Sequence, residues 1–98
     1  IGPCIVTKDE IVDPQNLNLK TRVNKEERQN SNTKYMIRNV QTLISELSQG
    51  LTLVPGDIIA TGTPKGVGLG LNPPKFLKTG DLIESEIEGI GVLRNTIS

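Results

Sequence analysis

The sequence has no histidine, no tryptophan, a single cysteine, and only one tyrosine and one phenylalanine among its 98 residues. Without histidine there can be no His–carboxylate relay and no histidine metal ligand, so the commonest general base of hydrolytic enzymes is excluded. One cysteine forms neither an internal disulfide nor a cysteine zinc site. Because aromatic residues make up only 2% of the chain, its core must be aliphatic.

The chain also has no excess of charge of either sign, since 11 Lys and Arg balance 11 Asp and Glu. A net charge of zero gives no broad electrostatic basis for binding nucleic acid or an anionic membrane. The apolar runs are only a few residues long, whereas a membrane-spanning helix needs about 18, and no signal-peptide pattern opens the chain. We therefore expect no nucleic-acid or membrane partner, and a cytoplasmic location, or a mitochondrial one in a eukaryote.

The length permits a single domain, and no charge block or low-complexity tract divides it. The chain begins at Ile1 rather than at methionine. A domain of this size buries only roughly 60–70% of its unfolded surface, and this one lacks the aromatic side chains that usually dominate core energetics. Both observations lead us to expect one piece of a larger folded unit.

Alternating apolar and polar residues predict strands in two regions. The first alternation covers residues 17–23, and the charged residues after it are expected to reverse the chain into Arg28-Gln29 as a hairpin. The second covers 83–88, and a glycine-containing turn leads from it to a strand at 92–94. A short apolar run predicts a further, buried strand at 58–61.

Glu84, Glu86 and Glu88 share one face of the predicted 83–88 strand. Such a row of carboxylates could bind a hard cation. Three acids on a solvated strand face more often serve solubility and protect a sheet edge, and we favour this second interpretation.

Apolar residues in the middle of the chain recur at helical spacing and predict one amphipathic helix packed on a sheet. Asn32 is the expected N-cap, and Gly50 is expected to end the helix in the left-handed conformation. The polar face is mixed in charge, which disfavours attachment to a membrane. The apolar stripe consists of Met36, Ile37, Val40, Leu43, Ile44 and Leu47.

Two isolated residues are assigned structural roles. Cys4 has no basic neighbour in sequence to lower its pKa, so we expect a buried apolar thiol. Tyr35 could donate a hydrogen bond to a ligand, but packing in the core is the favoured interpretation.

The segment with the most unusual composition is 61–70, Thr-Gly-Thr-Pro-Lys-Gly-Val-Gly-Leu-Gly. Its glycines let the backbone approach a ligand closely, and free N–H groups with Thr63 and Lys65 could hold a carboxylate or phosphate. A flexible loop without a ligand explains the pattern equally well. A nucleotide loop is disfavoured, because a P-loop ends in Gly-Lys-Ser/Thr at a helix start, whereas Asn72-Pro73-Pro74 opposes a helix here.

Short motifs follow one another in order along nearly all 98 residues. They are Gly2-Pro3, Ile5-Val6-Thr7, Asp13-Pro14-Gln15-Asn16-Leu17, Arg22-Val23-Asn24, Arg28-Gln29, Asn32-Thr33, Met36-Ile37, the stretch 55–68, Phe76-Leu77-Lys78 and Gly80-Asp81. In this order and spacing they resemble the C-terminal part of the fumarylacetoacetate hydrolase family. The resemblance covers about the last half of a usual catalytic domain of that family.

The resemblance implies an α+β, mainly β fold, a mixed β-roll with one amphipathic helix, of which residues 1–98 form the C-terminal portion of a single catalytic domain. It implies an enzyme that acts on small 2-oxo or diketo acids. The reaction would be hydrolysis of a carbon–carbon bond, decarboxylation or isomerisation. The shared step is an enolate stabilised by Mg²⁺ or Mn²⁺, which agrees with a chain that lacks histidine. Members are commonly homodimers or larger.

The resemblance assigns Gly62 and Thr63 to the binding of the substrate carboxylate. The metal carboxylates of the family, a Glu-x-Glu pair and a later Asp, and a following Lys precede the Gly2-Pro3 motif, so no residue of this chain is expected to bind the metal. Glu84 and Glu86 spell Glu-x-Glu in the wrong segment. The isolated chain is therefore expected to be inactive. Lys25 stands where relatives commonly have glycine, which predicts a changed turn.

The alternative is a non-catalytic roll that serves as a dimerisation or interaction module. The sequence before Ile1 would separate the two hypotheses. A Glu-x-Glu pair, a later Asp and a Lys there would favour the enzyme, and their replacement by residues that bind no metal would favour the module.

Overall fold

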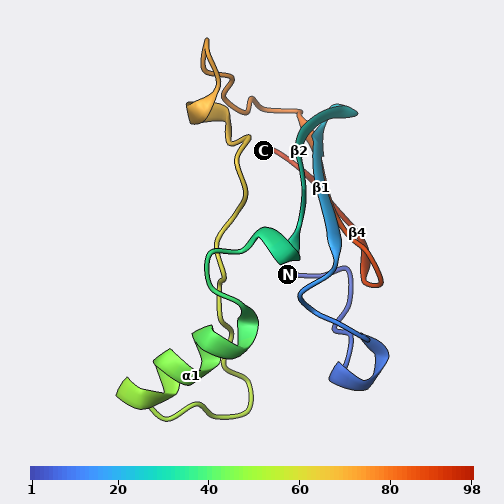
Figure 1. Ribbon diagram of the computed structural model, residues 1–98. Coiled ribbons are helices and arrows are strands. Elements are labelled where there is room, and N and C mark those ends of the chain that lie inside the picture. Colours follow the sequence, from blue (N-terminus) through green and yellow to red (C-terminus); the bar gives the residue numbers. More distant parts are fainter.

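The main element of the computed structural model, which describes residues 1–98, is a four-stranded antiparallel sheet (Figure 1). The sheet order is β2-β1-β3-β4. The strands are β1 (Asn18–Val23), β2 (Glu26–Asn32), β3 (Leu82–Ile87) and β4 (Gly91–Thr96). The helices are α1 (Val40–Gly50) and three short 3-10 helices, η1 (Lys8–Glu10), η2 (Thr33–Tyr35) and η3 (Gly68–Gly70). The predicted α+β, mainly β class with one helix is confirmed.

Two hairpins make up the sheet, and β1 pairs with β3 at its centre. Both hairpins lie where the alternating residues predicted them, because the same alternation that marks a strand also separates its two faces. The predicted buried strand at 58–61 is wrong. These residues form no ladder, and Ile58 is 74% exposed. A short apolar run indicates only that burial of the residues would be favourable, and this chain does not bury them.

The sheet has one apolar face and one charged face. Leu19 lies opposite Ile87, and Val23 lies opposite Ile83, on the apolar face. Gln29 of β2 is the partner of Thr21, so its side chain lies on the apolar face as well. The alternate residues of the same strands form the charged face.

An ion-pair ladder covers the charged face. The Arg22 guanidinium lies 3.5 Å from a Glu84 oxygen and 2.7 Å from Glu86 Oε2, while Arg94 Nε lies 2.9 Å from Glu84 Oε2. The Arg22 hydrogen bond lowers the pKa of Glu86, so the stabilisation from this pair is present at neutral pH and is lost as the pH falls through that lowered pKa. Because β3 is an inner strand, the predicted role of these glutamates in protecting a sheet edge is wrong.

The helix begins later than predicted. The Asn32 side chain caps η2 instead, where its Oδ1 accepts a hydrogen bond of 2.9 Å from the Lys34 N–H. Asn39 caps α1 by accepting from the Thr42 N–H at 2.7 Å, so Met36 and Ile37 precede the helix. Several asparagines in this stretch can cap, and their spacing alone does not select one. Gly50 ends α1 as predicted, but without a positive φ.

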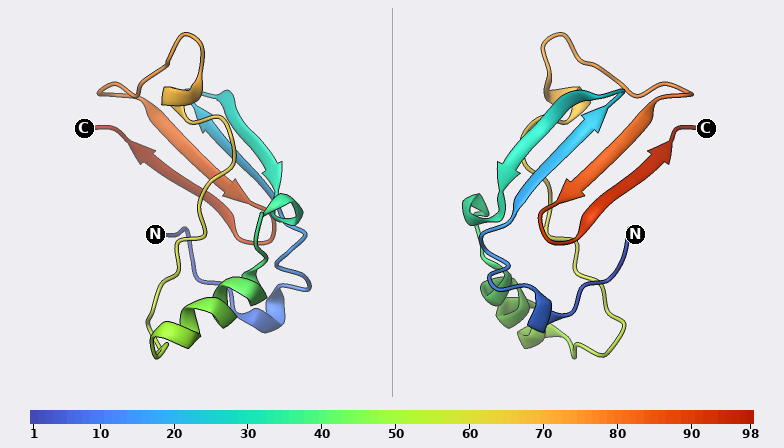
Figure 2. Two further views of the ribbon diagram at one scale, coloured as in Figure 1. Left: turned by 60° about the vertical axis from the view of Figure 1, so that its left-hand side comes forward. Right: turned by 90° about the vertical axis from the view of Figure 1, so that its right-hand side faces the viewer.

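The chain buries little of its apolar surface. Val23, at 7% exposed, is the only buried residue, and the radius of gyration of 15.2 Å exceeds the roughly 13 Å of a compact domain of about 100 residues. Figure 2 shows α1 beyond one end of the sheet, so the predicted packing of the helix on the sheet is wrong. The predicted burial of Cys4 and Tyr35 is also wrong, since both are exposed. No helix is both long enough and apolar enough to span a membrane.

The turn between β1 and β2 consists of Asn24 and Lys25, which have φ values of 50° and 69°. Two left-handed residues in succession are typical of a type I′ hairpin turn, in which Asn-Gly is the favoured pair. Asn24 is fixed by its side chain, because its Oδ1 accepts from the Leu82 N–H at 2.9 Å and its Nδ2 donates to Asp81 at 2.8 Å. Lys25 makes no such bond and retains the left-handed conformation at a steric cost, so the predicted change of turn at Lys25 is wrong.

We expect Lys25→Gly to stabilise the hairpin, because glycine adopts this conformation without the clash of a Cβ atom. The gain should be about 1 kcal/mol, which raises the melting temperature of the full-length protein by about 2–4 °C. Lys78→Gly, at an exposed residue without a positive φ, is the control and should give no increase. A lower melting temperature for Lys25→Gly than for the unsubstituted protein would contradict this account of the turn.

Candidate functional site

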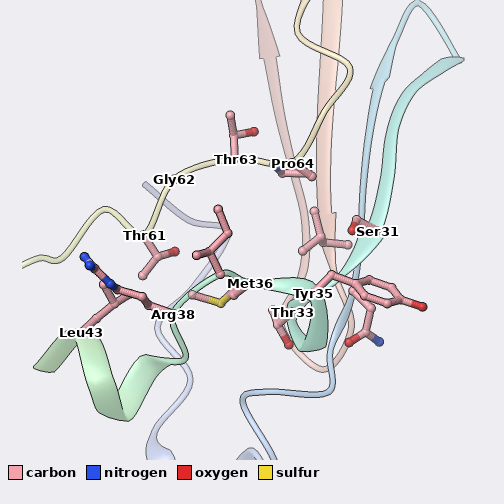
Figure 3. A pocket seen from close by; sticks show the side chains of 13 residues that line it. Ser31, Thr33, Tyr35, Met36, Arg38, Leu43, Thr61, Gly62, Thr63 and Pro64 are labelled. Atoms are coloured by element: carbon pink, nitrogen blue, oxygen red, sulfur yellow. The ribbon is translucent and has the colours of Figure 1, made fainter.

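A hollow of about 630 Å³ lies between the apolar face of the sheet, the start of α1 and the loop that carries the Thr-Gly-Thr sequence (Figure 3). It therefore joins segments that are far apart in the sequence. Gly62 and Thr63, the predicted substrate-binding residues, both line it. The complete lining is Leu19, Ser31, Asn32, Thr33, Tyr35, Met36, Ile37, Arg38, Leu43, Thr61, Gly62, Thr63 and Pro64.

The two threonines of the loop point to different sides of it. In Figure 3 the Thr61 side chain lies near Arg38 and Met36, whereas the Thr63 side chain leaves the loop on the opposite side. Thr63 is exposed and is one of the residues that line the hollow, so its side chain is open to solvent. Lys65, also predicted as an anion contact, does not line the hollow.

Arg38 is the only charged residue among those that line the hollow. Its Nη1 atom lies 3.3 Å from Glu46 Oε2 on α1, and its side chain remains 61% exposed. Because Glu46 already pairs with Arg38, an anionic ligand would be held by the remaining N–H donors of the guanidinium and by the neutral hydroxyl, amide and backbone groups of the lining. Arg38 was not among the predicted site residues, because no motif singles it out from the other basic side chains.

Gln15 fixes two walls of the hollow relative to each other. Its Nε2 atom donates to the Thr33 carbonyl at 3.0 Å, and its Oε1 atom accepts from the Val40 N–H at 2.6 Å. One side chain thus joins η2 to the first turn of α1. Gln15 stood within a family motif, but nothing in the sequence showed which backbone groups it would bind.

Gln29 attaches the Thr-Gly-Thr loop to the sheet. Its Nε2 atom lies 2.7 Å from Thr63 Oγ1 and 2.9 Å from the Pro64 carbonyl oxygen. Figure 2 shows the segment that contains this loop passing along one face of the sheet, the face to which Gln29 belongs. This contact was not predicted, since it joins residues that are 34 positions apart.

A second attachment holds the end of the loop. The Lys75 N–H donates to the Gly68 carbonyl at 2.9 Å, and Lys75 Nζ lies 3.1 Å from Glu26 Oε1 on β2. The hydrogen bond from Lys75 is the main reason why the pKa of Glu26 is lowered. The loop is therefore fixed to β2 at two points.

The residues of this chain do not fit a metal site. No group of three or more His, Cys, Asp or Glu side chains is placed to hold a metal ion. Glu84 and Glu86 point away from the loop, on the charged face of the sheet, and are already paired with Arg22. The arrangement can bind an anion at the loop, but it gathers no group of carboxylates there that could hold a metal ion.

Comparison with known proteins finds relatives along the whole chain. A family model described as fumarylacetoacetate (FAA) hydrolase C-terminal matches residues 1–98. An uncharacterized protein of Staphylococcus saprophyticus is 53% identical over 98 residues, which are 100% of this chain and 33% of that protein. One of Staphylococcus haemolyticus is 52% identical over the same shares. The chain thus spans about a third of the length of the curated relatives it matches.

Solved structures share the fold. A fumarylacetoacetate hydrolase from psychrophilic Exiguobacterium antarcticum gives a TM-score of 0.96 at 52% identity over 99% of this chain and 35% of that chain. A maleylpyruvate hydrolase from Sphingobium, in complex with manganese(II) and pyruvate, gives 0.88 at 40% identity over 98% and 34%. A 2-hydroxyhepta-2,4-diene-1,7-dioate isomerase from Mycobacterium marinum gives 0.84 at 44% identity over 98% and 34%. These similarities confirm the predicted fold.

The close approach of the loop to β2 depends on Gly66. This residue has a φ of +112°, and a Cβ atom at this position would collide with the carbonyl oxygen of Arg28. The backbone of the loop therefore lies against the backbone of the strand, and only a residue without a side chain fits between them.

We expect Gly66→Ala to displace the loop from β2, with a loss of about 1–3 kcal/mol from overpacking. Hydrogen–deuterium exchange of the loop amides in the full-length protein should become faster. The matched control is Gly56→Ala, because Gly56 also has a positive φ, +96°, but no atom within 4 Å of the added Cβ. Equal effects of the two substitutions on loop exchange would show that backbone strain, and not contact with the strand, explains the result.

Proposed function

The chain belongs to the fumarylacetoacetate hydrolase family, and we propose that it is the C-terminal portion of a single catalytic domain that acts on small 2-oxo or diketo acids. The observation that carries the proposal is the position of Thr63, an exposed residue that accepts a hydrogen bond from Gln29 and lines a hollow whose only charged lining residue is Arg38. The hydrolases and the isomerase among its structural relatives support an enzyme of this family.

In this proposal the chain supplies the substrate-anion loop. The Thr63 O–H and the backbone N–H groups of the loop donate hydrogen bonds to the substrate carboxylate, and hydrogen bonds to a charged group are stronger than neutral ones. Arg38 adds a positive charge on the other side of the same loop. The task of these residues is to bind and orient the substrate.

We propose a divalent cation, Mg²⁺ or Mn²⁺, as the cofactor, with ligands in a part of the protein outside these 98 residues. The manganese and pyruvate bound by the Sphingobium relative support this proposal. When bound, such an ion stabilises the negative charge of an enolate as a Lewis acid. We also propose a homodimer, for which the many exposed apolar side chains of this chain provide contact surface.

We expect Thr63→Ala in the full-length protein to weaken the binding of pyruvate, measured by calorimetry with Mn²⁺ present. Loss of one hydrogen bond to a carboxylate should reduce affinity by roughly tenfold or more, and Thr63→Ser, which keeps the hydroxyl, should retain most of it. Thr52→Ala, at an exposed threonine that does not line the hollow, is the control. The proposal fails if Thr63→Ala binds normally and the full-length protein turns over no acylpyruvate, oxaloacetate or hydroxydienedioate.

We expect the isolated 98-residue chain to be inactive, because its own residues form no metal site. The measurement is turnover of an acylpyruvate with excess Mn²⁺, with the full-length protein as the positive control. Metal-dependent turnover by the isolated chain would contradict the proposal that the metal ligands lie outside these 98 residues.

A further inference from the structure

We infer that Gln29 is a positioning residue that makes the Thr63 hydroxyl a hydrogen-bond donor toward the substrate carboxylate. The inference rests on the function proposed above and adds to it a residue on the sheet that does not itself touch the substrate. It starts from the two contacts of the Gln29 amide, at 2.7 Å to Thr63 Oγ1 and 2.9 Å to the Pro64 carbonyl oxygen.

The Pro64 carbonyl decides which way the Gln29 amide faces. A carbonyl oxygen only accepts hydrogen bonds, so the amide group that faces it must be the NH₂ and not the oxygen. The same NH₂ carries a second hydrogen, and Thr63 Oγ1 is the acceptor within reach of it. Both donors of the Gln29 amide are thereby used on adjacent residues of the loop.

The orientation of the Gln29 amide determines the direction in which the hydrogen of the Thr63 hydroxyl points. A hydroxyl group has one hydrogen and two acceptor lone pairs. Because Gln29 donates to one lone pair, the hydroxyl hydrogen must point away from Gln29. Thr63 is exposed and leaves the loop on the side away from Met36 (Figure 3), so this hydrogen is available to an incoming anion. A carboxylate needs such donors, and an unrestrained hydroxyl would first have to be turned toward it.

The position of Gln29 on β2 is what makes this contact possible. Its side chain lies on the apolar face, since Gln29 pairs with Thr21. The next residue, Asn30, pairs with Lys20 and faces the charged side, where its amide donates to Glu27 at 3.1 Å. Adjacent amides of one strand therefore have separate surroundings, and Asn30 provides a matched control.

The test is a double-mutant cycle in the full-length protein, with the affinity for pyruvate measured by calorimetry in the presence of Mn²⁺. The variants are Gln29→Met, Thr63→Ala and the double substitution. Gln29→Met keeps the length of the side chain and removes both N–H donors. The lost contact to Pro64 is common to both backgrounds, so the cycle isolates the part of the effect that passes through Thr63.

We expect Gln29→Met to weaken pyruvate binding by roughly five- to tenfold when Thr63 is present, and by less than about twofold in the Thr63→Ala background. In the Thr63→Ser background, where the hydroxyl remains, Gln29→Met should again weaken binding. Asn30→Leu should leave the affinity unchanged.

Two results would overturn the inference while the proposed function stands. One is normal pyruvate binding by Gln29→Met. The other is an equal loss of affinity with and without the Thr63 hydroxyl, which would make Gln29 only a support for the loop. Failure of the unsubstituted protein to bind pyruvate is a different result, which would overturn the proposed function and this inference together.

Discussion

The pairing of β1 with β3 is the interaction on which the rest of this structure depends. It joins two hairpins from opposite ends of the chain, and the hydrogen bond from the Glu88 N–H to the Asn18 carbonyl continues it beyond the strands. Val23 is the only buried side chain, so the chain has no closed hydrophobic core of its own. The backbone ladder and the ion pairs across it, chiefly those of Arg22, hold the hairpins together.

The two faces of this sheet have different tasks. On the charged face the glutamates of β3 are paired with arginines of the neighbouring strands. The apolar face receives the Thr-Gly-Thr loop through Gln29. One strand, β2, therefore connects the framework to the candidate site, and a shift of its register by one residue would move Gln29 to the wrong face.

The two hairpins could be predicted from the sequence, and the Thr-Gly-Thr segment could be singled out as a candidate binding loop, because both depend on local patterns. Alternation over 17–23 and 83–88 required hairpins, and the Thr-Gly-Thr segment stood out by composition. The start of α1 could not be predicted, since Asn32 and Asn39 are equally competent caps and the choice depends on Gln15, which binds the Val40 N–H from a distant segment. Gln29 and Arg38 were missed for the same reason, because their roles exist only where separate segments meet. The predicted burial of Tyr35 and of residues 58–61 was wrong because apolar character shows a need for cover and does not show what provides it.

The exposure around the hollow explains why the loop is only part of a working site. Tyr35 and Ile37, which line the hollow, are 70% and 103% exposed, so water reaches every group that would hold an anion. A hydrogen bond or a cation in contact with water contributes far less than the same group in a closed, low-dielectric site. The fixed Thr63 hydroxyl and the charge of Arg38 therefore reach their full effect only when further protein covers these apolar side chains. The same contact would bury the apolar surface that this chain leaves exposed. Folding and formation of the site therefore both require contact with further protein.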